Sequence, residues 1–184
     1  YAAMVADELR NDVNKRQINW DVLYNSNYGA FDVVRNANGI PGNDVSGRRS
    51  KYIIEDRIIN TTKYNFNSTL NTNISENVIF TAGVSYQSQK NHYYKEVDDL
   101  LGGEFYVDVN QFGERDFPTN NSAAQNDLNR PNRILKTGDK FGYNYDLNIK
   151  KGSVWLMGVF KFRKFDVFIA SEHSYTSFFR YGNV

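Results

Sequence analysis

Acidic side chains that could act on a sugar or hold a cation are close together in one stretch of the chain. Asp98 and Asp99 are adjacent, and Glu96 and Glu104 lie nearby. The two carboxylates of a glycosidase must stand a defined distance apart across the sugar, and a Ca²⁺ site needs a preorganised set of oxygens. Adjacency in a loop supplies neither arrangement. We therefore interpret this acidic stretch as solvated loop surface.

Other groups with catalytic or metal-binding chemistry are sparse. The chain has no cysteine and two histidines, His92 and His173, which leaves little material for a zinc centre. Glu172 precedes His173, but neighbouring residues of a strand point to opposite faces, so the two do not form a catalytic pair. No serine lies in the glycine elbow of a hydrolase, and "LGGEF" lacks the spacing of a phosphate-binding loop. We expect no enzyme, no bound metal and no cofactor.

Aromatic residues are the sharper candidates for contact with a ligand. Tyr93, Tyr94, Phe105 and Tyr106 lead into a long loop, and Trp20 lies in a plausible short helix. Such rings could stack on a sugar or hold a peptide side chain. Equally, they could pack a loop on itself or form an aromatic belt at a membrane surface. The structural role is the commoner one, and these five residues remain the candidates for ligand binding.

The segments that would position these residues alternate between apolar and polar side chains with a period of two residues. Over 64–74, residues such as Tyr64 and Leu70 at even positions alternate with asparagine and threonine at odd positions, and the alternation resumes after a short turn at 75–77. Alternation on both sides of a short turn predicts an antiparallel hairpin. The upstream stretch 51–63 extends the first strand well beyond the roughly 3 to 10 residues of most globular strands.

The second half of the chain repeats this plan. Residues 140–162 alternate again, and 165–179 have the pattern of a returning strand. Gly152 could mark a bulge that changes the face on which later residues lie. The sequence therefore predicts an all-β fold with about four long strands in two hairpins.

Long connections precede each hairpin. The first contains two plausible short helices, "AAMVADELRNDV" and "QINWDVLYNS", and the second is rich in Asn, Asp and Gly. Connections of this length are abnormal in compact soluble domains, whereas short turns at one rim and long loops at the other are typical of outer-membrane barrels. We divide the chain into an extracellular loop at 1–50, a first hairpin at 51–97, an extracellular loop at 98–138 and a second hairpin at 139–184.

Strand length and composition agree with a membrane barrel. Eleven residues at about 3.3 Å each span roughly 36 Å, and a tilt of about 45° reduces this to roughly 25 Å, the height of the lipid-facing band. A mean hydropathy of −0.62 does not argue against this location, because every second residue of a barrel strand faces a polar lumen. The near-balance of 22 basic and 21 acidic residues excludes the basic field of a nucleic-acid-binding protein.

Four stretches carry a resemblance to a known family: "RQINWDVLYNSN", "NANGIPGNDVSGRRSKYIIEDR", "FTAGVSYQSQKNHYYKEVDDLLGGEFYVDVNQFGERDFP" and "AAQNDLNRPNRILKTGDKFGYNYD". In them the chain resembles TonB-dependent outer-membrane receptors of the Bacteroidetes type. Within that family it is most similar to the Oar-like subfamily, which has a carboxypeptidase-regulatory-like N-terminal domain. The resemblance covers nearly the whole chain, as an interior section of the family's β-barrel.

The resemblance implies a barrel of about 22 strands with a plug domain inside. In such a receptor, extracellular loops capture a scarce nutrient such as a siderophore, glycan or peptide, and the inner-membrane TonB complex supplies energy for import. The regulatory-like domain, the TonB box, the plug and most strands are absent from this sequence. The piece would supply barrel wall and ligand-side loops in the bacterial outer membrane.

Four strands alone cannot close a barrel, because open edges in lipid leave backbone groups unpaired at several kcal/mol each. The implied partners are therefore outer-membrane lipid, the remaining strands and plug of the same receptor, the TonB complex through the missing parts, and an unidentified ligand.

A soluble β-sandwich that binds carbohydrate or another ligand, with aromatic loops as its platform, is the alternative. It predicts that the chain melts cooperatively as a monomer in buffer without detergent. The membrane hypothesis predicts detergent dependence. It also requires that no second layer of the same chain covers Tyr64, Phe66 and Leu70.

Overall fold

The computed structural model describes residues 1–183 and is predominantly antiparallel β. Strands account for 54% of the chain and helices for 19%, which confirms the β-rich class predicted from the alternation. No helix within residues 1–183 is long and apolar enough to cross a membrane. The chain forms two compact units. The first unit is Tyr1–Arg57 with Lys95–Tyr143, and the second unit is Ile58–Tyr94 with the described residues from Asn144 onward.

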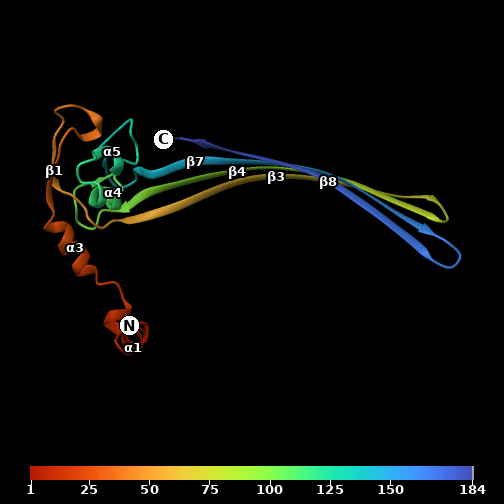
Figure 1. Ribbon diagram of the computed structural model, residues 1–184, viewed down its shortest axis with the longest axis horizontal. Coiled ribbons are helices and arrows are strands. Elements are labelled where there is room, and N and C mark those ends of the chain that lie inside the picture. The colour runs from red at the N-terminus through yellow and green to blue at the C-terminus, as the bar shows by residue number, and fades with distance from the viewer. Residues whose placement is uncertain (184) are drawn as a thin grey trace. The chain divides into compact units, whose positions relative to one another are not determined.

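Four long strands form one sheet in the order β3-β4-β7-β8 (Figure 1). Two hairpins supply them, as the alternation predicts. The strands are β3 (Ile54–Ser75), β4 (Val78–Asp99), β7 (Lys140–Lys161) and β8 (Asp166–Gly182).

The first unit contains short elements from both long connections. Helices predicted near 2–13 and 17–26 are present as α1 to α3, whereas the short strands and the later helices were expected to be loop. The elements are α1 (Ala2–Asn11), α2 (Val13–Arg16), α3 (Trp20–Tyr28), β1 (Phe31–Val34), η1 (Ala37–Gly39), β2 (Val45–Arg48), β5 (Tyr106–Val107), α4 (Gln111–Asp116), α5 (Asn121–Ala124) and β6 (Ile134–Leu135).

Asparagine side chains begin two of these helices. The side-chain oxygen of Asn19 accepts a hydrogen bond from the backbone N–H of Val22 at 3.2 Å, at the start of α3. Asn110 does the same for α4, with the N–H groups of Phe112 and Gly113 as donors. Each cap satisfies backbone donors that a helix start leaves unpaired. The abundance of asparagine in these connections is thus partly helix-capping chemistry.

The first unit has a hydrophobic core made from both connections. Phe105 and Val107 of the later connection pack with Val34 and Ala37 of the earlier one. Backbone hydrogen bonds join the same two regions, since the N–H of Ser50 donates to the carbonyl of Phe105 at 2.8 Å. A second cluster contains Val97, Tyr106, Leu135 and Phe141. The two predicted loops are therefore one packed body and not two independent loops.

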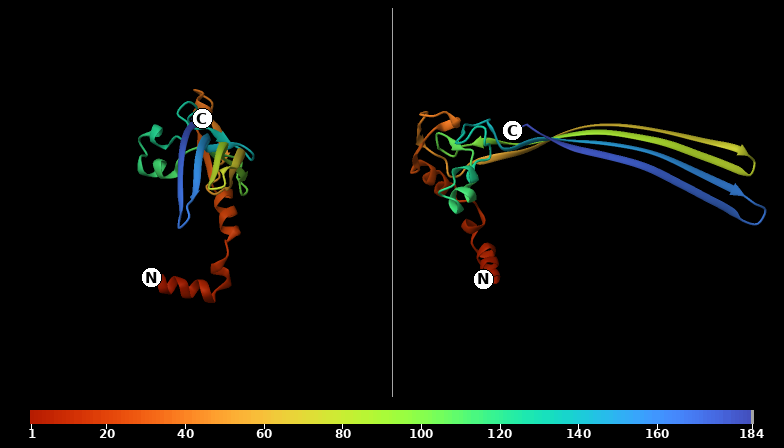
Figure 2. Two further views of the ribbon diagram at one scale, coloured as in Figure 1. Left: turned by 90° about the vertical axis from the view of Figure 1, so that its right-hand side faces the viewer. Right: turned by 45° about the horizontal axis from the view of Figure 1, so that its top comes forward.

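The second unit is a single-layered sheet, with no second layer of its own residues over either face (Figure 2). Its β3 side chains Tyr64, Phe66 and Leu70 are 60 to 70% exposed. All the buried hydrophobic residues that the structure describes belong to the first unit, while the buried polar residues of the second unit are Thr81, Asn91 and Ser153. The second unit therefore has no hydrophobic core of its own.

The register of β7 and β8 corrects the expectation of a bulge at Gly152. The two strands pair without interruption from Tyr145 opposite Gly182 to Lys161 opposite Asp166, and Gly152 pairs with Tyr175. Gly152 keeps an ordinary strand conformation, whereas Gly142, near the start of β7, has a φ of +68°. Because the parity does not reset, Leu147 and Leu156 lie on opposite faces of the sheet.

Candidate functional site

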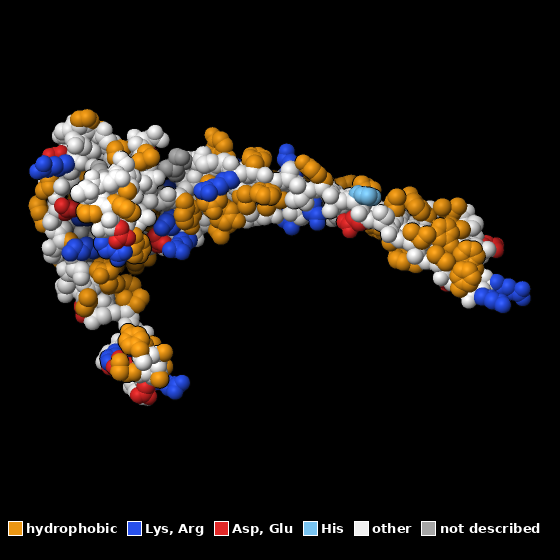
Figure 3. Space-filling view, viewed as in Figure 1, with side chains coloured by type: hydrophobic (Ala, Val, Ile, Leu, Met, Phe, Trp, Pro, Cys, Tyr) orange, Lys and Arg blue, Asp and Glu red, His pale blue; other side chains and the backbone are white. Residues whose placement is uncertain are grey.

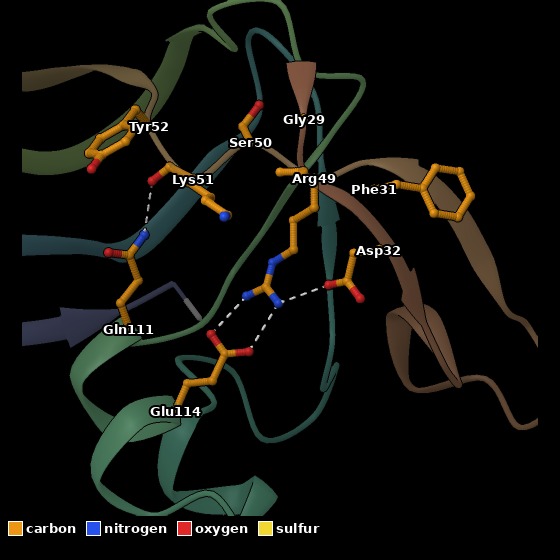
Figure 4. A pocket seen from close by; sticks show the side chains of 10 residues that line it. Gly29, Phe31, Asp32, Arg49, Ser50, Lys51, Tyr52, Gln111 and Glu114 are labelled. Carbon is orange, nitrogen blue, oxygen red and sulfur yellow. Dashed lines mark hydrogen bonds and ion pairs between the residues drawn. The ribbon is translucent and has the colours of Figure 1, made fainter. Parts of the chain in front are cut away.

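A cavity of about 510 Å³ opens in the first unit around Arg49 (Figure 4). Three separate parts of the chain line it. They are the junction of α3 with β1, the segment that follows β2, and α4. The lining residues are Gly29, Ala30, Phe31, Asp32, Arg49, Ser50, Lys51, Tyr52, Gln111 and Glu114.

Arg49 forms the electrostatic centre of this cavity. Its guanidinium donates to both carboxylate oxygens of Glu114, at 3.0 and 2.8 Å, and to Asp32 at 3.1 Å. The side chain is 22% exposed. Burial acts to lower the pKa of Arg49, but the hydrogen bonds and charges of Glu114 and Asp32 outweigh it, so this pKa lies above its ordinary value. Arg49 therefore stays charged and ties β1 to α4 through a planar fork.

The remaining lining groups suit binding better than catalysis. Gln111 donates its amide N–H to the carbonyl of Lys51 at 3.3 Å (Figure 4). The charges of Arg49 and Lys51 balance those of Asp32 and Glu114, and the rings of Phe31 and Tyr52 are exposed. Such a lining can accept hydrogen bonds from hydroxyl or amine groups and can contact an apolar part of the same ligand.

A second cavity, of about 630 Å³, lies in the first unit and shares Gln111 with the Arg49 cavity. Lys95 is its central charge. The ammonium of Lys95 donates to Glu55 at 2.8 Å and lies 4.6 Å from the centroid of the Phe141 ring. Burial acts to raise the pKa of Glu55, but hydrogen bonds from Lys95 and Arg57 outweigh it and hold this pKa below its ordinary value.

Two of the predicted ligand-contact residues are in the core of the first unit. Phe105 is 3% exposed and packs inside the first core cluster, so its ring faces protein. Tyr106 is 9% exposed and borders the second cavity. Burial and the charge of Asp108 raise the pKa of Tyr106. Trp20, at the start of α3, is half-exposed and lines neither of the two cavities.

The other two predicted residues lie in the second unit, on adjacent positions of β4. The ring of Tyr93 stacks on Tyr145 of β7 with centroids 5.0 Å apart, and the ring of Tyr94 lies 4.8 Å from that of His92. Consecutive strand residues point to opposite faces, so the two tyrosines do not share a surface. The five candidates therefore do not form one aromatic platform.

The three residues that form the ion-pair cluster of the Arg49 cavity are not among the residues predicted from the sequence to bind a ligand. Arg49 is 17 positions from Asp32 and 65 positions from Glu114. No local spacing signals such a cluster, because the packing of the two connections creates it. Within residues 1–183, no three His, Cys, Asp or Glu side chains come together in a group that could hold a metal ion.

One face of the sheet in the second unit carries a row of polar side chains along β4. Gln87 donates to Gln89 at 3.3 Å, Gln89 donates to Asn91 at 2.9 Å, and Asn91 donates to the hydroxyl of Tyr93 at 3.3 Å. Further along the same face, the hydroxyls of Ser85 and Ser153 join β4 to β7 at 2.7 Å. These amide and hydroxyl groups satisfy one another, whereas the buried hydroxyl of Thr81 on the same face has no hydrogen-bond partner among the described residues, and Trp155 lies on this face against Gly83.

The opposite face is apolar toward the turns and polar toward the other end of the strands. On β4 it carries Val78, Phe80, Ala82, Val84 and Tyr86, and then Lys90 and His92. Lys90 pairs with Asp146 at 2.9 Å, and His92 bonds to Asn144 at 2.7 Å. β7 and β8 extend the apolar part with Val154, Leu156, Phe160, Val167 and Ile169. Hydrophobic side chains gather over these strands in Figure 3.

The fold thus defines a predominantly antiparallel β protein whose four-stranded sheet is bare on both faces in the second unit. No protein-family model matches the chain, and none of the curated proteins matches it.

Proposed function

We propose that the chain is a wall segment, with ligand-side loops, of a TonB-dependent outer-membrane receptor that captures and imports a scarce nutrient. The observation that carries this proposal is the position of the apolar side chains. The first unit buries its apolar residues in a core, whereas the second unit exposes large ones on a single-layered sheet. Water does not stabilise such a surface, and the hydrocarbon of a bilayer does.

The apolar part of the face has a height that fits a bilayer. From Val78 to Tyr86 the strand takes eight steps, which at about 3.3 Å each span about 26 Å, or about 20 Å of height at a tilt of about 40°. The lipid-facing band of outer-membrane barrels is about 25 Å tall. The ion pair of Lys90 with Asp146 follows just beyond Tyr86, where the proposal has the strand leave the hydrocarbon.

The polar row on the opposite face supports a water-filled lumen. Gln87, Gln89 and Asn91 alternate with residues of the apolar face along the same strand. Lipid on one side and a polar interior on the other is the pattern of barrel walls. In this proposal the row lines the interior of the receptor.

The edges of the sheet define the partners that the wall requires. β3 and β8 are the outer strands of the four-stranded sheet. An edge strand has backbone N–H and C=O groups without partners, and a membrane barrel must pair all of them. The remaining strands of the receptor fill this role, its plug occupies the lumen, and the TonB complex acts through the plug.

The Arg49 cavity is the proposed ligand contact of this segment. Balanced charges, hydrogen-bond acceptors and exposed rings suit a ligand that has both polar and apolar groups, as siderophores, glycans and peptides do. In this assignment the first unit belongs to the extracellular side of the receptor. Its role is capture, and movement of the ligand depends on parts of the receptor outside this chain.

The alternative of a soluble β-sandwich lacks support from the sheet. A sandwich packs two sheets face to face at about 10 Å, with the core between them. The residues of the second unit supply one layer, and Tyr64, Phe66 and Leu70 remain exposed on it. The geometry therefore favours the membrane proposal.

A cysteine scan along β4 tests the proposal, because the chain has no cysteine and each introduced thiol is unique. Single cysteines at Thr81, Ala82, Val84, Ser85, Tyr86 and Gln87 would each carry a spin label in the complete receptor, in membranes. Labels at Ala82, Val84 and Tyr86 should be accessible to oxygen dissolved in lipid, and labels at Thr81, Ser85 and Gln87 should not. Loss of this two-residue period, or equal protection of all six labels, would refute the proposal.

A further inference from the structure

The turn between β7 and β8 combines exposed aromatic rings with a tight backbone. The backbone N–H of Phe162 donates to the carbonyl of Phe165 at 2.9 Å, and the strands pair as far as Lys161 opposite Asp166. The rings of Phe162 and Phe165 stack with centroids 4.9 Å apart, yet they are 54% and 61% exposed. The turn therefore presents a rigid pair of phenyl groups to its surroundings.

Three cations surround this phenyl pair. Lys161, Arg163 and Lys164 are exposed, and none of them has an ion pair with another residue of the described part of the chain. In Figure 3, Lys and Arg side chains gather at the end of the sheet where this turn lies, beside hydrophobic side chains. We call residues 161–165 the basic tip.

The acidic groups near the basic tip do not cancel its charge. Asp166 is opposite Lys161 in the β7–β8 register, and Glu76 lies in the turn between β3 and β4. That neighbouring turn is close, since the N–H of Lys161 donates to the carbonyl of Asn77 at 2.8 Å. Three cations face two carboxylates, and residues 162–165 contain no acid.

An exposed basic turn alone is usually a solvated surface, but the stacked rings change what this one fits. Bare phenyl groups are poorly placed in water and well placed at the boundary between lipid headgroups and acyl chains. Lys and Arg bury their alkyl stems along apolar surface and direct their charge to phosphates. On β8, Phe168 and Ile169 are also exposed, on opposite faces of the sheet.

We propose that the basic tip binds anionic phospholipid headgroups at the surface of the bilayer that the second unit enters. The phenyl pair lies at the boundary between hydrocarbon and headgroups, and the three cations contact phosphate groups. This inference rests on the proposed function only in that the second unit lies in a membrane. It adds a preference for anionic lipid on the side of the membrane that holds this turn.

Flotation of the complete chain with lipid vesicles tests the inference. The chain would be kept in a mild detergent and diluted out of it into vesicles of phosphatidylcholine alone, or into vesicles that also contain phosphatidylglycerol, at low and at high salt. Arg163→Ser combined with Lys164→Ser should weaken binding to the phosphatidylglycerol vesicles by roughly 20-fold at low salt, since each surface cation contributes about fivefold. Binding to phosphatidylcholine should be unchanged, and high salt should remove the difference.

A matched control is available on the same strand. Lys150 and Lys151 are also adjacent and exposed on β7, and their double change to serine should reduce binding less than the tip variant. Equal losses in both variants, or no loss in the tip variant, would overturn the inference while leaving the wall assignment intact. Absence of binding to either vesicle, even by the unaltered chain, would instead contradict the proposed membrane location and with it the inference.

Discussion

Asn27 holds three parts of the first unit together with one side chain. Its amide N–H groups donate to the carbonyls of Tyr52, Leu100 and Leu101 at 2.7 to 3.1 Å. Its oxygen accepts from the backbone N–H groups of Lys51 and Tyr52 at 2.8 and 3.1 Å. The residue is fully buried. A buried amide with this many backbone partners connects α3 to the ends of the two connections that form the unit.

Replacing Asn27 by alanine should destabilise the first unit by about 3 kcal/mol or more, because several buried backbone groups lose their partner. Thermal unfolding followed by near-ultraviolet circular dichroism measures the change. Asn25→Ala, on the exposed side of the same helix, is the control and should stay within about 0.5 kcal/mol of the unaltered chain. Equal stability of the two variants would show that the hydrogen bonds of Asn27 add nothing net.

Glu55 gives the first unit a dependence on pH whose sign follows from its pKa. The folded pKa lies below the ordinary value of 4.5, so the stabilisation is present above about pH 4.5 and is lost as the pH falls through the folded pKa. Glu55→Gln should cost about 1 to 2 kcal/mol at pH 7. Melting temperatures of both chains at pH 7 and pH 3 test this. If the two chains differed in melting temperature as much at pH 3 as at pH 7, this prediction would be wrong.

At the scale of residues, the sequence was poor at locating the candidate site. The counts of cysteine and histidine led to the expectation of no metal or cofactor site. The Arg49 cluster could not be predicted, because its members meet only through non-local packing of β1, β2 and α4. Phe105 resembled a surface aromatic in the sequence, because it lies just before the two-residue strand β5 and makes only an isolated bridge with Arg49, so no alternation marks it as buried.

The strands β4 and β7 are joined by a specific contact between a glycine and an indole ring. A side chain at Gly83 would collide with the ring of Trp155, which lies against the glycine from the neighbouring strand. Gly152, on β7, has no atom within 4 Å of the position that a Cβ would take. These two glycines differ in their surroundings although both lie in the middle of long strands.

Gly83→Ala should destabilise the sheet by about 1 to 3 kcal/mol, because Trp155 must leave its position. Gly152→Ala is the matched control and should be neutral or stabilising by about 0.5 kcal/mol. Guanidinium unfolding in detergent gives the free energies, and tryptophan fluorescence of a Trp20→Phe background reports on the ring of Trp155. An unshifted emission spectrum in the Gly83 variant would argue against the contact.

At the scale of elements, alternation predicted the long strands because side chains of a strand alternate by geometry, and a run of many residues makes the period visible. The strands β1, β2, β5 and β6 have two to four residues each. Such runs are too short to show a period, and pairing with distant segments holds them in place. Gly152 forms no bulge because β7 pairs with β8 without interruption. The sequence of β7 alone does not reveal how it pairs with another strand.

The two units contrast in how they deal with apolar side chains. The first unit contains the whole described hydrophobic core, and the second unit exposes rings and aliphatic groups along β3, β7 and β8. Removal of apolar groups from water stabilises a core such as that of the first unit, whereas the sheet of the second unit leaves its apolar groups uncovered. In the proposed function, lipid and further strands of the receptor cover them.

In buffer without detergent, the chain should associate into large particles, because both edges and both faces of the second unit are available for contact. In a mild detergent it should elute as a small, defined particle. Size-exclusion chromatography with light scattering distinguishes the two states. A monomer in plain buffer that melts cooperatively would support the soluble binding module instead.

The first unit is assembled from segments that the β3–β4 hairpin separates along the chain. Asn27 reaches Leu101 across 74 positions, and the side chain of Asn38 accepts from the backbone N–H of Ile134 across 96. When two residues so far apart in the sequence come into contact, the chain between them loses conformational entropy. This cost arises before the contact itself contributes to stability. α3 can therefore complete its contacts only when Leu101 is in place, and Asn38 of η1 only when Ile134 is in place. The rate at which the first unit folds then depends on how soon the β3–β4 hairpin forms and brings its two ends together.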